Sequence, residues 1–134
     1  MEQLALLANR KRRSAARLTK SSKIIKTIIA AIQDKKGENI ISLDLRKINE
    51  AVADFFILCE ASNQPQIRAI AEHIEWKVKE KCEENPWHHE GYNSLHWVLL
   101  DYVNVVVHVM QPDTRNFYKL EEMWSDAKTE EHNG

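Results

Sequence analysis

Residues 95–110, LHWVLLDYVNVVVHVM, decide the fold of this chain, because they have the pattern of two strands joined by a tight turn. Apolar residues continue to Leu100, turn-forming residues occupy 101–104, and a second apolar run covers 105–110. In that second run, alternate side chains fall on opposite faces. Both faces are largely apolar, so we expect the hairpin to lie inside a covered sheet and not at its edge.

Helical and strand patterns flank this hairpin. Ser21 or Ser22 is placed to cap a helix that continues to Lys35, with Gly37 in the position that ends it. The run 53–59, ADFFILC, is continuously apolar, so it should be a central strand. In chain order we expect a helix over 22–35, strands over 40–45 and 53–59, a helix over 62–84, a weak strand over 87–92, the hairpin, and a closing helix through Phe117, Leu120 and Trp124.

This order, α-β-β-α-β-β-β-α, predicts an α/β fold in which one mixed β-sheet is covered by two main helices. The chain has 134 residues, of which 43% are hydrophobic and 29% charged, which fits one globular domain. We expect three parts: a basic N-terminal arm over 1–20, the folded domain over 21–128, and a disordered tail over 129–134.

Charge is distributed unevenly between the arm and the rest of the chain. Residues 1–23 contain seven basic groups and one acid, a net charge of +6, so the remaining 12 basic and 19 acidic groups carry −7. A protein that grips RNA over its whole surface would be basic throughout. The distribution favours binding to a basic protein surface, with the arm as a candidate for a weak contact with RNA phosphates.

The two cysteines, Cys59 and Cys82, are 23 positions apart and form no CxxC pattern, which argues against a zinc or redox site. No apolar run approaches the roughly 20 residues of a membrane span. Residues 1–8 are too short for the apolar part of a secretory signal. We therefore expect a cytoplasmic protein with reduced thiols and no membrane partner.

The usual centres of catalysis are missing from the sequence. The chain has only three glycines, too few and too scattered for a phosphate-binding loop. Metal-dependent phosphoryl transfer needs acids two apart on one strand, but Asp44 and Asp101 each stand alone. Nucleophile signatures such as GxSxG are also missing. We therefore expect a protein that is not an enzyme and that has no catalytic residue and no cofactor.

The histidines are explained more simply by surface positions or core packing than by a metal ion. Adjacent His88 and His89 on a strand point to opposite faces, so they cannot easily share one ion. His108 lies between valines and should be a partly buried, hydrogen-bonded histidine. We expect no metal site.

A binding surface is the remaining possibility, and aromatic residues mixed with charged ones in the last 40 positions are its candidates. Trp97 shares a strand face with Leu99 and Asp101. One acid among large apolar groups indicates a face left open for a partner. For Phe117 and Trp124, burial in the core is the favoured alternative.

Four segments together resemble the ribosomal silencing factor family, which is also called the Iojap family. They are DFFI at 54–57, QIRAIA at 66–71, EG at 90–91 followed by WVLLDY at 97–102, and RNFYKLEEMW at 115–124. The segments occur in the family's order, and the resemblance covers roughly residues 24–128.

The resemblance implies a nucleotidyltransferase-like fold that lacks the catalytic acids. It also implies a function, because family members bind the ribosomal protein called L-fourteen on the intersubunit face of the large subunit. There they block association with the small subunit and repress translation under nutrient limitation. By residue match, the implied partner-binding residues are Trp97, Leu99, Asp101, Tyr102, Arg115, Tyr118 and Glu121.

The chain departs from the family pattern in two places. The family usually has Gly and then Asp or Asn in the hairpin turn, where this chain has Val103 and Asn104, so we expect an altered turn or a positive φ at Asn104. The arm has no counterpart in the family.

One alternative function is a residual nucleotidyltransferase or nucleotide-binding enzyme that uses Asp44 or Asp101. The other is a homodimer joined by the aromatic face, so the protein would be a monomer or a homodimer.

Overall fold

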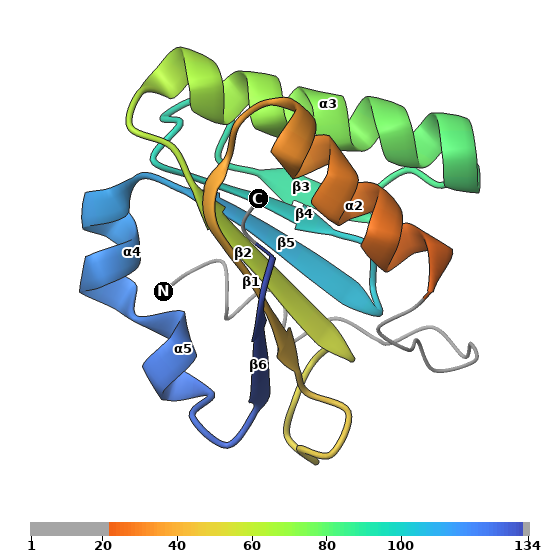
Figure 1. Cartoon of the computed structure of the whole chain (residues 1–134), viewed down its shortest axis with the longest axis vertical. Helices are drawn as coiled ribbons and strands as arrows, with labels where there is room; N and C mark the ends of the chain where they lie inside the picture. The colour runs from red at the N-terminus through yellow and green to blue at the C-terminus, as the bar shows by residue number, and fades with distance from the viewer. Residues whose placement is uncertain (1–21, 133–134) are drawn as a thin grey trace.

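The computed structural model describes residues 22–132, which form a six-stranded mixed sheet with helices on both faces (Figure 1). None of the helices in this described range is long and apolar enough to cross a bilayer. The predicted α/β class is confirmed. The elements are α2 (Lys23–Asp34), β1 (Glu38–Asp44), β2 (Phe55–Glu60), α3 (Gln64–Cys82), β3 (His88–Glu90), β4 (Trp97–Asp101), β5 (Val105–Met110), α4 (Pro112–Tyr118), α5 (Leu120–Met123) and β6 (Lys128–Glu131).

The strand order is β3-β4-β5-β2-β1-β6, so the hairpin and β2 occupy the middle of the sheet as predicted. β2 and β5 are parallel, and every other neighbouring pair is antiparallel. The central strands are buried along their whole length, apart from the last residue of β2. Continuous apolar sequence produces this position, because a strand with two apolar faces is stable only where both are covered.

Two hydrophobic cores lie on opposite faces of the sheet. The first core lies under α2 and α3, which cover one face of the sheet (Figure 1). Both helices contribute isoleucine-rich stripes to it. The second core lies on the other face, where α5 contributes Leu120. Alternation along β5 assigns Val105, Val107 and Val109 to the first core, and Val106 and Met110 to the second.

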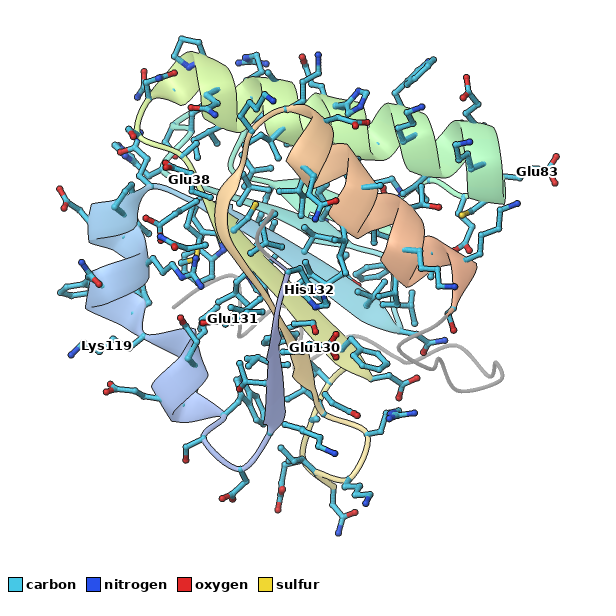
Figure 2. All side chains as sticks on the ribbon, viewed as in Figure 1. Glu38, Glu83, Lys119, Glu130, Glu131 and His132 are labelled. Carbon is cyan, nitrogen blue, oxygen red and sulfur yellow. The ribbon has the colours of Figure 1, made fainter. Side chains whose placement is uncertain are left out.

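The expected disordered tail is wrong for residues 129–132. Residues 128–131 form β6, which pairs antiparallel with β1 and closes one edge of the sheet. His132 follows β6 directly (Figure 2). It continues this pairing by donating its N–H to the carbonyl of Ile40 at 2.8 Å, and its Nε2 lies 2.8 Å from Ser42 Oγ. All four side chains of β6 are exposed and none is apolar, so the sequence has no alternating pattern from which this strand could be predicted.

The expected closing helix through Phe117, Leu120 and Trp124 is broken. Lys119 adopts a left-handed conformation, with φ of 48°, between α4 and α5. The break turns Phe117 outward, where it is 78% exposed, while Leu120 is fully buried and Trp124 packs partly buried against the second core. The expected burial of Phe117 was therefore wrong.

Positive φ angles also fall on residues that the sequence did not indicate. Lys36, and not Gly37, adopts the left-handed conformation after α2, and Gly37 then donates its N–H to the carbonyl of Ile32. In the hairpin turn Val103 has φ of 75°, and Asn104 donates its N–H to the carbonyl of Tyr102. This is a γ-turn, so the expected alteration of the turn is confirmed, while the other alternative, a positive φ at Asn104, is not adopted.

Gly91 supports the start of β4 through a close backbone approach. It has φ of 98°, and a Cβ built on it would lie 1.9 Å from the carbonyl oxygen of Trp97. We expect Gly91→Ala to lower the free energy of unfolding by at least about 2 kcal/mol, because it adds both a clash and an unfavourable φ. Urea denaturation would measure the loss. Ser94→Ala, an exposed change in the same loop, should have little effect, and equal stability of both variants would contradict the argument.

Candidate partner-binding site

Trp97 does not lie on an open face, so that expectation from the sequence was wrong. The side chain is only 7% exposed and belongs to the second core. Its indole N–H donates to Nδ1 of His108 at 3.1 Å, and its ring centroid lies 5.0 Å from that of Tyr118. The reason is the position of β4 between β3 and β5, with its second face directed into the core.

Three other candidates on the hairpin are also buried. Leu99 and Asp101 are inaccessible on the face of Trp97, whereas Tyr102 is 5% exposed and belongs to the first core on the opposite face. Asp101 Oδ1 accepts the Val103 N–H at 2.8 Å, which stabilises the γ-turn. Burial raises the pKa of the Tyr102 hydroxyl. These residues therefore do not form one surface.

Arg115 is a buried connector and not an exposed anchor. Its side chain is 9% exposed. Nη1 donates to the carbonyl of Asn39 at 2.7 Å and to Glu60 Oε1 at 3.1 Å, while Nη2 and Nε donate to Glu121 Oε2 at 3.2 and 3.3 Å. Arg115 thus ties α4 to the start of β1, to the end of β2 and to α5. A hollow of about 380 Å³ borders the same group.

The exposed part of the predicted set lies on α4 and α5. Tyr118 and Glu121 are half-buried, and the neighbouring Phe117 and Met123 are 78% and 45% exposed. The rings of Phe117 and Tyr118 meet edge to face with centroids 4.9 Å apart. We call Phe117, Tyr118, Glu121, Glu122 and Met123 the α4–α5 surface.

The α4–α5 surface combines aromatic and sulfur-containing side chains with two carboxylates, and Lys119 projects outward beside it (Figure 2). This is the composition of an interface anchor for a basic partner. Sequence reasoning favoured burial of Phe117, because its spacing from Leu120 predicted one continuous buried stripe, and it did not single out Met123.

The described residues do not assemble a catalytic or metal-binding centre. Asp44 lies opposite Phe55 on the first face, and Asp101 lies opposite Val106 on the second, so the two carboxylates cannot bind one ion. Asp44 instead pairs with Arg46 at 2.6 Å, which lowers the pKa of the carboxyl. No group of three His, Cys, Asp or Glu side chains within 22–132 could hold a metal ion.

The thiol of Cys59 is also unsuited to nucleophilic chemistry. Cys59 and Cys82 are free, and Cys59 is fully buried. Burial raises the pKa of Cys59 to about 12, which keeps it protonated at neutral pH.

His108 is the one fully buried histidine among the described residues. It lies between Trp97 and Phe56, whose ring centroid is 4.6 Å away. Nδ1 accepts the indole N–H of Trp97, whereas Nε2 is buried without a hydrogen-bond partner. Burial lowers the pKa of His108 to about 3, so the ring is neutral at physiological pH.

Comparison with known proteins gives a consistent result. The family model described as "Ribosomal silencing factor during starvation" matches residues 18–134. The chain is 40% identical over 107 residues to ribosomal silencing factor RsfS of Bacillus subtilis, covering 78% of this chain and 86% of that protein. It is 36% identical over 114 residues to the protein of the same name from Halalkalibacterium halodurans, covering 85% and 96%. A crystal structure of a Chromobacterium violaceum protein matches with a TM-score of 0.73 and 35% identity, covering 84% of this chain and 92% of that chain.

Loss of the Arg115 guanidinium should destabilise the fold. We expect Arg115→Met to lower the free energy of unfolding by about 2–3 kcal/mol, because Glu60 and the carbonyl of Asn39 lose a buried donor. Denaturant unfolding would measure it. Lys119→Met is the control, since its 3.9 Å pair with Glu122 is exposed and should contribute under about 1 kcal/mol. Similar losses in both variants would refute the role given to Arg115.

Titration of His108 should make stability depend on pH. The folded pKa of about 3 lies below the unfolded value of 6.5, so the unfolded chain binds more protons between these values. Stability from this group is present above pH 6.5 and falls as the pH drops toward 3. From pH 7 to 5 the wild type should lose about 2 kcal/mol more than His108→Asn, which does not titrate. His96→Asn, at an exposed position, should follow the wild type.

Proposed function

The chain belongs to the ribosomal silencing factor family, and we propose that it binds the large ribosomal subunit through the L-fourteen protein and blocks association with the small subunit. The family match over residues 18–134 is the observation that carries this proposal. Relatives named ribosomal silencing factor RsfS, matched over most of their length, support it. The proposed action is translational repression under nutrient limitation, in the cytoplasm and without catalysis.

We place the first contact with the partner on the α4–α5 surface. Its aromatic groups are exposed, which allows them to be buried against another protein. Its carboxylates complement a basic ribosomal protein, which would accelerate encounter and orient the bound partner. Glu121 is held by Arg115, so part of this charge is already positioned before binding.

The buried members of the predicted set have a supporting role in this proposal. Trp97 packs beneath Tyr118, and Asp101 stabilises the hairpin turn that precedes β5. Leu99 and Tyr102 fill the two cores on either side of β4. Of the seven predicted residues, only Tyr118 and Glu121 lie on the α4–α5 surface, so only these two would contact the partner directly.

The blocking step is steric. A folded domain bound on the intersubunit face of the large subunit would occupy space that the small subunit needs. This requires no bound nucleotide and no chemical step, in agreement with the separation of Asp44 and Asp101 on opposite faces of the sheet. The residual-enzyme alternative has no support in the described geometry.

The double variant Phe117→Ala/Tyr118→Ala tests the contact surface. We expect it to weaken binding to isolated large subunits by about 2 kcal/mol, roughly 30-fold in Kd, because two interface anchors are truncated. Co-sedimentation with separated subunits gives the affinity. Trp76→Ala is the matched control, since Trp76 is 55% exposed on α3, on the opposite face, and should bind as the wild type does.

A second measurement addresses the blocking step. Adding the wild type to mixed subunits should reduce the fraction that sediments as whole ribosomes, and the double variant should restore it. Binding without any fall in subunit association would refute steric blocking. Equal loss of binding in Trp76→Ala and the double variant would place the contact elsewhere.

A further inference from the structure

The two edges of the sheet differ in their chemistry. The order β3-β4-β5-β2-β1-β6 gives β3 and β6 one neighbouring strand each within residues 22–132. β6 has the sequence KTEE with every side chain exposed, and charged side chains on an edge oppose pairing with a further strand. β3 has the sequence HHE, and Trp87 directly before it is 50% exposed. The edge at β3 is therefore the one suited to pairing.

An imidazole and a carboxylate lie on the same face of β3. His88 lies opposite Asp101 of β4. Glu90 lies opposite Leu99, which belongs to the second core. Because cross-strand neighbours share a face, both side chains are on the second face of the sheet. His88 Nε2 lies 3.0 Å from Glu90 Oε2, and the two side chains are 37% and 29% exposed. The edge thus presents a complementary pair to solvent.

We propose that β3 pairs antiparallel with β3 of a second copy of this chain, about a two-fold axis at His89. In this register His88 lies opposite Glu90 of the partner subunit, and symmetry repeats the pair. Residues directly opposite each other have Cβ atoms about 5 Å apart, whereas residues two apart along one strand are separated by roughly 6.8 Å. Two close imidazole–carboxylate pairs therefore join the subunits, which makes this edge complementary to itself.

The same register accommodates Trp87. It places the indole opposite Gly91 of the partner subunit, and a glycine has no side chain to obstruct it. The ring centroid of Trp87 lies 5.9 Å from that of His88, so the indole stands beside the pairing edge. Burial of one exposed indole from each subunit supplies the apolar part of the contact.

Helix α3 leaves room for the second copy. Its extended contacts with the sheet are with β4 and β5. Neighbouring strands are about 4.8 Å apart, so the β4 strands of the two subunits would be roughly 14 Å apart. Packed helices need only about 8–10 Å between their axes. The two copies of α3 therefore do not clash across the new pairing.

The contact is small, because each subunit contributes one short strand and one indole. We expect weak association, with a Kd of roughly 10–100 µM, as for small transient interfaces. This edge is a different surface from the aromatic face considered from the sequence. The pairing also does not rest on the proposed function, since it uses no residue of the α4–α5 surface.

Two exposed tryptophans provide a matched pair of variants in the full-length chain. We expect Trp87→Ala to raise the Kd of the dimer at least about tenfold, because symmetry removes the indole twice. Trp76→Ala should dimerise as the wild type does. Trp76 is 55% exposed but stacks on His73, which bonds to Asp34 of α2 and not to β3.

Sedimentation equilibrium from low micromolar to near-millimolar concentration measures these Kd values. A wild type that stays monomeric over this range would leave the edge to a strand of another protein, which overturns the proposal. Equal Kd values for the two tryptophan variants would also overturn it. Loss of the dimer in Phe117→Ala/Tyr118→Ala, with no effect of Trp87→Ala, would place the contact on the α4–α5 surface and reject pairing through β3.

Charge variants test the register. His88→Glu alone sets two carboxylates opposite each other in both pairs, and Glu90→Lys alone removes the carboxylate from both. Each should raise the Kd at least about tenfold. An equimolar mixture should dimerise again, because one subunit then carries two carboxylates and the other an imidazole and an ammonium group. Circular dichroism of each variant confirms that the fold is retained. A mixture that dimerises no better than its components would overturn the proposal.

Discussion

The fold depends on the requirement that the β4–β5 hairpin and β2 be covered on both faces. These strands carry apolar side chains in both directions, so neither face can be left in water without a large loss of hydrophobic stabilisation. The parallel pairing of β2 with β5 joins them into one central slab. The other elements pack around these central strands. Helices α2 and α3 cover one face, α4 and α5 lie on the other, and β3 and β6 form the edges of the sheet.

The same requirement explains the polar groups in the second core. An indole N–H in a buried position needs an acceptor, and His108 supplies its Nδ1 from the neighbouring strand. The histidine must stay neutral for this, and burial keeps it so. Asp101 solves a different problem, because its carboxylate accepts the N–H of Val103 within a turn that a β-branched residue adopts only with strain.

Much of this architecture could be predicted from the sequence, and the failures share one physical cause. The hairpin, the central strand 53–59 and the long helix follow from local periodicity, which a single chain displays. β6 was missed because its four exposed residues pair through the backbone alone. The break at Lys119 and the positive φ of Val103 are fixed by tertiary contacts that no local pattern records. Asp101 was interpreted as a sign of an open face because the sequence does not show that its carboxylate accepts a hydrogen bond from Val103 within the turn.

The position of the α4–α5 surface is as important as its composition. The two helices are short, so propensity alone would not hold them in place. Arg115 anchors them from within, with hydrogen bonds to the start of β1, to the end of β2 and to α5. Phe117 and Tyr118 are therefore presented from a fixed base, and less conformational entropy is lost when a partner covers them. A connector buried behind the contact surface can thus contribute to recognition without touching the partner.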